Sequence, residues 1–365
     1  MSCSSFRRQL LCGVSAFALP IAVTLTPVHA DGFPPGTSIS IEGGAICGLG
    51  DNGTISATQD FYTTPYGSGS VTAKSSFGKV DCGSTGRLGL FQEQQGMFGF
   101  ADYWGIFVRH EDFGSQKFSA SNSKSIPVPF NALPNTYTYH FGVDSAGAFD
   151  EERTVVDFEV GKDLGIGAPD TKVRFFGGLR YARYTSELTD HGKASASLGS
   201  DICVNAPCTS FSYGYNFAFQ ARDTFQGFGP RLGLSGQFPL YRDISMVFSG
   251  SGSALWGNHD VQISDTISGA TGKFTFSDTG WVTNLEGEVG LSWLLSPRGA
   301  KLVAGVRWEG WFDQNQFKDY TVALDTTASA ISKDCGSGSL DRNDWGPFVR
   351  FNLPIGGAPP VTPLK

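Results

Sequence analysis

Long apolar runs are missing from the chain beyond residue 30. No later stretch approaches the eighteen consecutive apolar residues that a membrane-spanning helix requires, so any crossing of a membrane must be made by strands. Charge is also sparse, at 17% of residues, whereas the 365 residues include 48 glycines and 30 phenylalanines. This composition predicts a β-rich protein with many glycines and aromatic side chains.

The chain also lacks a basic surface and a metal-binding pattern. Its formal charge is −7, and loss of Arg7 and Arg8 with the first thirty residues would make it −9. Proteins that bind nucleic acid use a basic face, so we expect no nucleic-acid partner. No Cys-x-x-Cys and no pair of histidines at ligand spacing occurs. We therefore expect no metal site and no cofactor.

Residues 1–30 resemble an export signal. Arg7 and Arg8 form a basic start, Leu10–Leu25 is an apolar core, and Ala30 is a small residue suited to cleavage. The alternative is a membrane-anchoring helix, but the run is near the lower length limit and Pro20 interrupts it. We expect residues 1–30 to be removed, which leaves Asp31 as the first residue.

The segment Thr154–Thr185 indicates strands. Val156, Phe158 and Val160 alternate with Asp157 and Glu159. After a turn rich in Gly, Pro and Asp, a second run alternates in the same way. A period of two is typical of a strand, so the two runs predict an antiparallel hairpin with one apolar and one charged face. Either a soluble sandwich or an outer-membrane barrel could use such a hairpin.

Ten segments have strand character, and all but the short Arg87–Phe91 are near the nine to eleven residues that a tilted strand needs to cross a bilayer. They are Thr37–Cys47, Arg87–Phe91, Trp104–Phe113, the two runs of the hairpin, Gln226–Phe238, Ile244–Trp256, Trp281–Leu294, Lys301–Phe312 and Trp345–Leu353. The connections between them alternate in length. The long ones are expected to be loops at Gly48–Gly86, Gly114–Arg153, Ser186–Phe225, Gly257–Gly280 and Asp313–Asp344.

Long loops at one rim and short turns at the other are typical of outer-membrane barrels, whereas a soluble sandwich gives no reason for this alternation. We therefore predict an all-β protein, a transmembrane antiparallel up-and-down β-barrel of about ten strands, with eight to twelve possible. The barrel is expected to span residues 31–355, and residues 356–365 form a Pro-rich tail. The expected location is the bacterial outer membrane.

The positions of the tryptophans give modest support to the predicted barrel, since such rings favour the two membrane interfaces. Trp104 and Trp293 are expected near the short-turn rim. Those expected near the long-loop rim are Trp256, Trp281, Trp308 or Trp311, and Trp345.

Several strand motifs resemble the Legionella-type pore-forming outer-membrane protein family. They are residues 155–161 (VVDFEVG), 175–183 (FFGGLRYAR) and 225–234 (FQGFGPRLGL), with similar first and last strands at residues 40–44 (SIEGG) and 345–350 (WGPFVR). The resemblance implies a porin-like barrel that allows small solutes or ions to pass. One departure is the tail after Phe351, because such barrels usually end at a terminal aromatic residue.

Parity assigns a set of charged side chains to the lumen: Glu42, Asp157, Glu159, Arg174, Arg180, Arg231, Glu286, Glu288, Arg307, Glu309 and Arg350. They could line an open pore and select solutes by charge. They could equally pair across a narrow, closed lumen, because charges in a confined interior persist when paired. Ten strands lie near the size at which side chains fill the interior.

Five cysteines remain after residue 30: Cys47, Cys82, Cys203, Cys208 and Cys335. We expect them at strand ends or in long loops, in an oxidising compartment. Cys203 and Cys208 could close a small ring, and Cys47 and Cys82 could attach the first loop to its strand. Cys335 would be left for an intermolecular bridge or a free thiol.

We expect no enzymatic activity and no catalytic residues. A protease or lipase site needs a histidine oriented by a carboxylate. His110 with Asp112 is the sensible pair, because they share a face, and no nucleophile motif accompanies them. Other candidates are His191 with Asp190 and His259 with Asp260.

A non-enzymatic surface adhesin or structural barrel is the main alternative to a porin, and it would use the aromatic segment of residues 211–217. Expected partners are outer-membrane lipid, lipopolysaccharide and small solutes or ions, and an oligomer is possible.

Overall fold

The computed structural model describes residues 34, 36–50, 53–63, 67–77, 81–97, 99–129, 136–166, 171–200, 211–267, 269–325 and 331–356. Its strands are β1 (Thr37–Gly50), β2 (Gly53–Thr63), β3 (Gly67–Phe77), β4 (Asp81–Met97), β5 (Ala101–Pro129), β6 (Thr136–Asp163), β7 (Lys172–Ser200), β8 (Phe211–Tyr241), β9 (Ile244–Ile267), β10 (Ala270–Leu294), β11 (Lys301–Asp325) and β12 (Ile331–Pro354). None of the described residues forms a helix that could span a membrane.

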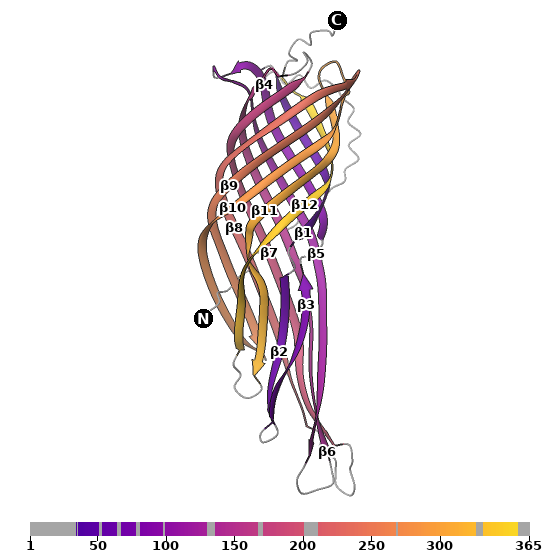
Figure 1. Ribbon diagram of the computed structural model, residues 1–365, viewed down its shortest axis with the longest axis vertical. Helices are drawn as coiled ribbons and strands as arrows, with labels where there is room; N and C mark the ends of the chain where they lie inside the picture. Colours follow the sequence, from indigo (N-terminus) through magenta and orange to yellow (C-terminus); the bar gives the residue numbers. More distant parts are fainter. Residues whose placement is uncertain are drawn as a thin grey trace.

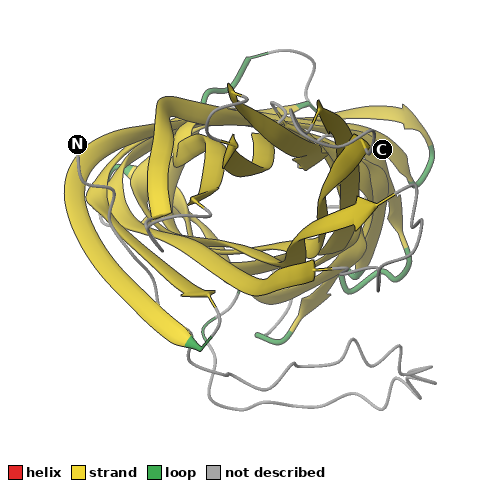
Figure 2. Cartoon of the chain, turned by 90° about the horizontal axis from the view of Figure 1, so that it is seen from below, coloured by secondary structure: helices red, strands yellow, loops and turns green. Residues whose placement is uncertain are grey.

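Ten of these strands close into an antiparallel ring (Figures 1 and 2). Strands β4 to β12 pair in chain order, and β1 closes the ring by pairing with both β4 and β12. Each closing pair keeps one register over many residues, for example from Ser38 opposite Pro354 to Gly50 opposite Arg342. The predicted ten-stranded up-and-down barrel is therefore confirmed.

The two rims differ as expected for such a barrel. One rim carries the short turns, including the two-residue turn Arg242–Asp243, and it also carries the start of β1 and the end of β12. Arg242 has a φ of 45°, a left-handed conformation that a two-residue hairpin turn demands. In outer-membrane barrels the short turns face the periplasm, so the opposite rim faces the cell exterior.

The long connections are mostly strand rather than loop, which corrects the prediction. The strands β5 to β8 contain 29, 28, 29 and 31 residues, about three times the length that crosses a bilayer. Together they continue the barrel wall outward as a long extension (Figure 1). The aromatic segment at residues 211–217 accordingly begins β8, with Phe217 buried and Tyr213 45% exposed.

The first connection folds as a hairpin of its own. Its strands β2 and β3 pair antiparallel, and β2 joins the outer part of β11 in parallel, with Thr54 to Asp60 opposite Asp319 to Asp325. Val71 of β3 is 2% exposed, because its side chain enters the interior of the extension. The hairpin therefore helps to fill the outer end of the barrel.

A belt of apolar side chains covers the outside of the barrel near the short-turn rim. It includes Leu88, Leu179, Leu232, Val289 and Val349, each between 52% and 59% exposed. Side chains so apolar are stable when exposed to acyl chains, so this belt marks the membrane-facing zone.

Aromatic rings mark the outer edge of the belt. Trp256, Trp281, Trp308 and Trp345 are all more than 40% exposed. Trp256 pairs across strands with Trp281, with ring centroids 5.1 Å apart, and Trp308 pairs with Trp345. Trp311, the alternative to Trp308, instead points inward and is buried.

Beyond the aromatic edge, the polarity of the two faces reverses. The inward side chains there are apolar and form one cluster, here called the apolar plug: Val71, Ala73, Phe118, Phe141, Val143, Phe149, Leu188, Ala194, Phe217, Phe219, Ala221, Val261 and Ile263. The outward side chains of the same strands include Asp144, Glu152 and Lys117, which are exposed. Water surrounds the extension, so its apolar face turns inward, whereas lipid surrounds the membrane zone and draws the apolar face outward.

Candidate functional site: the charged lumen

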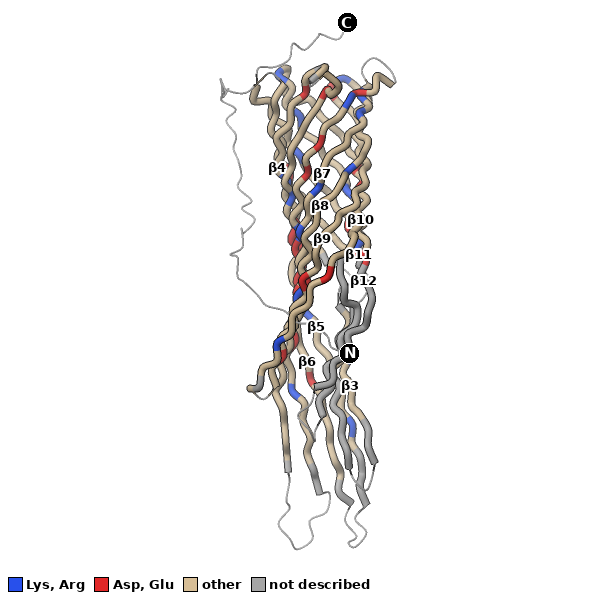
Figure 3. The backbone as a smooth tube through the Cα atoms, turned by 90° about the vertical axis from the view of Figure 1, so that its left-hand side faces the viewer, with Lys and Arg blue, Asp and Glu red and all other residues tan. Residues whose placement is uncertain are grey.

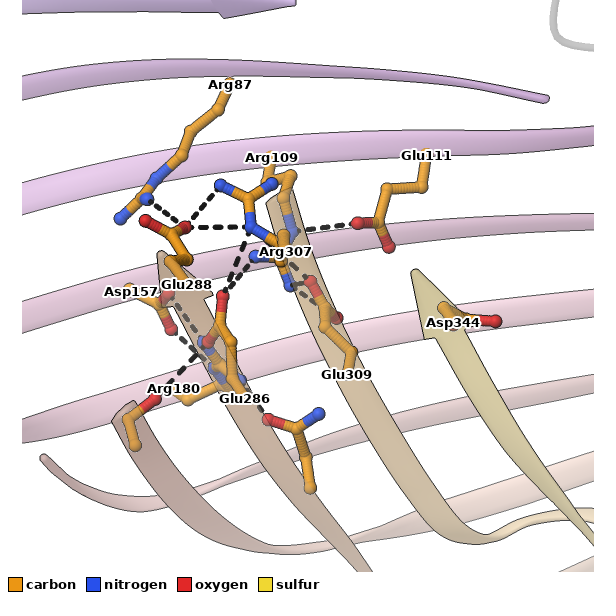
Figure 4. Close-up of polar contacts among 12 residues, drawn as sticks. Arg87, Arg109, Glu111, Asp157, Arg180, Glu286, Glu288, Arg307, Glu309 and Asp344 are labelled. Carbon is orange, nitrogen blue, oxygen red and sulfur yellow. Dashed lines mark hydrogen bonds and ion pairs between the residues drawn. The ribbon is translucent and has the colours of Figure 1, made fainter. Parts of the chain in front are cut away.

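Inward-facing charges fill the middle of the lumen. Among the residues that the structure describes, eight arginines and nine carboxylates take part in ion pairs there, and we call this set the ionic layer. Its members are Arg87, Arg109, Arg153, Arg180, Arg231, Arg307, Arg342, Arg350, Glu42, Glu111, Glu151, Asp157, Glu159, Glu286, Glu288, Glu309 and Asp344. Figure 3 marks the backbone positions of charged residues along the strands, and several contacts of the ionic layer appear in Figure 4.

Arg109 on β5 spans the lumen. Its guanidinium contacts Glu286 on β10 and Glu309 on β11, at 2.8 Å for Glu309, and also Glu111 on its own strand at 3.0 Å. Strand β10 lies five positions from β5 in the ring of ten, so the contact joins opposite walls. Its side chain is 3% exposed. The lumen is thus bridged at this level by one side chain.

Glu286 is the most heavily shared carboxylate. Besides Arg109, it accepts from Arg180 at 2.7 Å and from Arg231 at 3.1 Å. Arg180 also makes a two-pronged contact with Asp157, at 2.6 and 2.8 Å. The planar fork of arginine suits such paired contacts, which explains why guanidiniums rather than ammonium groups occupy these positions.

A second group closes the seam between the first and last strands. Arg350 on β12 contacts Glu42 on β1 at 2.6 Å and Glu288 on β10 at 2.7 Å. Arg307 on β11 contacts the same two carboxylates at 2.6 and 2.5 Å. These pairs bind strands from both ends of the chain to one another.

Toward the exterior the layer becomes mixed with aromatic rings. Arg153 is fully buried, contacts Glu111 at 2.6 Å and Asp344 at 2.7 Å, and lies over the Trp311 ring at 4.6 Å. Arg342 contacts Glu151 and lies 4.3 Å from the Phe113 ring. The apolar plug begins beyond these residues.

On the periplasmic side of the ionic layer lies a cavity of about 400 Å³. Its lining includes Gly36 and Gly356 at the short-turn rim and Arg231 and Glu286 at its inner end. Inward glycines make room for its aromatic lining, since a Cβ at Gly89 would lie 2.3 Å from the Phe107 ring. Along its axis, the lumen therefore passes from an open cavity to paired charges and then to apolar side chains.

All eleven residues that parity assigned to the lumen lie inside the barrel, and the ionic layer joins ten of them. Arg174 lies nearer the rim, where it contacts Asp163 at 2.7 Å and Glu93 at 3.1 Å. Parity overlooks Arg87, Arg109 and Glu111, although all three fall in predicted strands. Asn284, a neutral partner of Arg180, also falls in a predicted strand. Four further members are missed because they lie in segments predicted to be loops: Glu151, Arg153, Arg342 and Asp344.

The predicted histidine–carboxylate pairs do not form. His110 contacts Thr154 at 3.0 Å, while Asp112 accepts from the Gly114 amide. His259 is buried 3.6 Å from Asp223, and its neighbour Asp260 accepts instead from Ser277 on the outer face. Asp190 and His191 likewise point to opposite faces.

Asp190 is a buried carboxyl in the extension, outside the membrane zone. Burial raises its pKa to about 6, although the Ser145 hydroxyl donates to it at 3.0 Å and favours the charged form. The Asp190 carboxyl therefore titrates close to neutral pH.

Cys47 and Cys82 form a disulfide between β1 and β4. They lie directly opposite in the strand register, so the pairing proposed from the sequence connects adjacent strands. Cys203 and Cys208 lie outside the described residues. Cys335 falls in β12 rather than in a loop, and its side chain is outside the described part.

Residues 102–350 match the model of a family described as the Legionella pneumophila major outer membrane protein precursor. Among solved structures, the chain is similar to the outer membrane protease OmpT from Escherichia coli, at 12% identity and a TM-score of 0.39, over 86% of this chain and 96% of that one. It is also similar to the toluene transporter TodX of P. putida, at 8% identity and a TM-score of 0.14, over 89% and 91% of the two chains. No curated protein matched the sequence.

Proposed function

This chain belongs to the family of the Legionella pneumophila major outer membrane protein and lies in the outer membrane, and within that family we propose that it is a non-enzymatic barrel that is closed to solutes. Its function is then structural and surface-directed: the membrane zone anchors a long β extension outside the cell. Its belt contacts outer-membrane lipid, and the polar side chains above the aromatic edge face lipopolysaccharide.

The contact of Arg109 with Glu286 and Glu309 carries this proposal. A solute on its way through would have to separate buried ion pairs from opposite walls. Removing one partner from a buried pair typically costs about 3–5 kcal/mol, and several such pairs lie at one level. The apolar plug beyond them would then have to be displaced as well.

Single-channel recording of the mature chain, refolded and inserted into planar bilayers, tests closure. We expect the current to stay at baseline at all applied potentials, and sugar-loaded liposomes carrying the protein not to swell. Flotation with the liposomes checks insertion, and a general porin in the same membrane is the positive control. Regular conductance steps from the inserted wild-type chain would contradict the closed barrel.

A porin that passes small solutes or ions is the second candidate. The cavity of about 400 Å³ favours it, because the cavity opens toward the periplasmic rim and already occupies part of the path. Under this alternative the conductance steps would appear, and exchanging Glu286 for Gln would change the cation-to-anion selectivity.

A further inference from the structure

We propose that the periplasmic cavity binds a small monoanion with a flat apolar body, of the chemical class of aromatic carboxylates. A volume of about 400 Å³ lies within the range of small-molecule sites. Residues of the short-turn rim, such as Arg298 and Lys172, belong to its lining, so a ligand can enter from the periplasm. This inference goes beyond the closed barrel and concerns what the open end of the lumen holds.

Positive charge is in excess in the lining. The ionisable side chains are Arg87, Lys172, Arg174, Arg231, Arg298, Lys301 and Arg350 against Glu93, Glu159, Glu286 and Glu288. Three of the seven cations have carboxylate partners outside the lining, since Arg350 contacts Glu42, Arg174 contacts Asp163 and Arg231 lies 3.8 Å from Asp157. Two of the four carboxylates likewise have arginine partners outside the lining, since Glu286 contacts Arg109 and Glu288 contacts Arg307. When these five groups are set aside, four cations face two carboxylates, so an added anion is favoured.

Arg87 is a largely buried cation of the lining whose contact with a carboxylate is weak. Its ion pair with Glu288 is long, at 3.5 Å, whereas Arg307 approaches the same carboxylate at 2.5 Å. The Arg87 side chain is 10% exposed, and its guanidinium lies 4.3 Å from the Phe107 ring centroid. A guanidinium has five N–H donors and binds a carboxylate in a two-pronged manner. A ligand carboxylate would complete the partners that Glu288 leaves incomplete.

Lys301 provides a second cation nearer the rim. Its ammonium donates to the Gln237 side chain at 3.2 Å, and no carboxylate in the described part of the chain lies within ion-pair distance of it. Arg298, in the turn before it, is exposed at the mouth. Cations at the mouth attract an anion, and Arg87 receives it deeper in.

Aromatic rings provide the apolar half of the site. Phe91 lies between Tyr103 and Phe107, with ring centroids 6.1 and 6.4 Å away. Phe176, Phe248 and Phe348 also belong to the lining. Rings at such spacings accept a flat apolar group at their faces or edges. An inorganic anion such as phosphate would leave this surface unused, which is why we assign a carboxylate with an aromatic body.

Calorimetric titration of the refolded mature protein in detergent micelles tests the proposal, with benzoate as the probe. Benzamide and benzylamine have the same ring with a neutral or a cationic group. We expect saturable binding of benzoate, at least about tenfold weaker binding of benzamide, and none of benzylamine, since loss of one charge pair is worth about a factor of ten. Empty micelles give the background heat.

Variants locate the site. Arg87→Gln and Lys301→Gln are each expected to weaken benzoate binding about tenfold. Lys117→Gln, an exposed change on the extension, is the matched control and should leave it unchanged. If Arg87→Gln fails to fold, Lys301→Gln at the rim decides the question, because Lys301 has no ion pair with any residue that the structure describes.

No saturable binding by the folded wild type would overturn the proposal. So would equal affinities for benzoate and benzamide, or unchanged affinity in the folded Lys301→Gln protein. The test is separate from that of closure: a conducting protein that binds benzoate contradicts the closed barrel alone, and a silent protein that does not bind it contradicts this site alone.

Discussion

Single residues in the lumen contribute to stability through their neighbours rather than alone. Arg109, Arg180 and Arg231 all converge on Glu286, which is 5% exposed. A buried carboxylate surrounded by three guanidiniums is stable only as a set, because each charge left without a partner would bear its full desolvation cost.

Exchanging Glu286 for Gln should therefore destabilise the barrel strongly. We expect the free energy of unfolding to fall by about 3–5 kcal/mol, because three buried guanidiniums lose a shared negative charge. Urea titration of the detergent-refolded protein measures this. Glu152→Gln, an exposed change on β6, is the control and should alter it by less than about 0.5 kcal/mol. A similar small loss for both variants would show that the ionic layer contributes little.

Asp190 predicts a pH dependence of stability. Its pKa rises from 3.8 to about 6 on folding, so the folded protein binds the proton more tightly than the unfolded chain does. The contribution of Asp190 to the free energy of unfolding is most favourable below about pH 4. It declines as the pH rises from about 4 to 6 and stays constant above that range. Asp190→Asn should remove this decline and raise stability at pH 7 to 8.

Urea midpoints measured between about pH 4 and 8 check this prediction, with one unit of pKa shift worth about 1.4 kcal/mol. The control is Asp144→Asn, whose carboxylate is exposed on β6. If wild type and Asp190→Asn lose stability in parallel over this range, the dependence arises elsewhere.

At the scale of strands, side chains alternate between the inner and outer faces along the whole strand. The polarity of the two faces, however, reverses between the membrane zone and the extension. On β6, Phe158 points to lipid and Asp157 to the lumen, but farther out Phe141 points inward and Asp144 outward. The sequence pattern predicts the membrane half of β6 well, because charged and apolar residues alternate over residues 156–160. For the outer half the pattern predicts loops, because small residues such as Ser, Ala and Gly interrupt the alternation there.

The hairpin β2–β3 should depend on its apolar anchor. Val71→Asp would bury an unpaired carboxylate against Phe118 and Phe141, at a cost of several kcal/mol, about 2–5. We expect the hairpin to leave the extension and become sensitive to proteinase K on intact cells, while the membrane barrel keeps its heat-modifiable mobility on gels. Lys74→Asp places the same group on the exposed face of β3 and should remain protected. Equal protection of both variants would mean that the anchor is dispensable.

At the scale of the whole molecule, the number of strands and the closed ring follow from the sequence, and the filling of the lumen follows in part. Arg180 and Glu286 were predictable from parity. Arg109 was not, because β5 carries apolar residues on both faces, with Phe107 inward and Val108 outward. Cross-lumen pairing depends on which strands lie opposite each other, and that information appears only when the ring closes.

The length of the outer wall has a consequence for what the cell displays. Tyr181 lies level with Trp256 at the aromatic edge, because both pair with Phe228 of β8. From Tyr181 to Ser200, β7 continues for twenty residues, and a rise of about 3.2–3.4 Å per residue carries it about 60 Å along the strand. Its outer half thus stands well clear of the lipid headgroups. We therefore expect antibodies to reach this protein on living cells through its backbone-paired outer strands, and sequence change there to be free of the constraints that lipid imposes below.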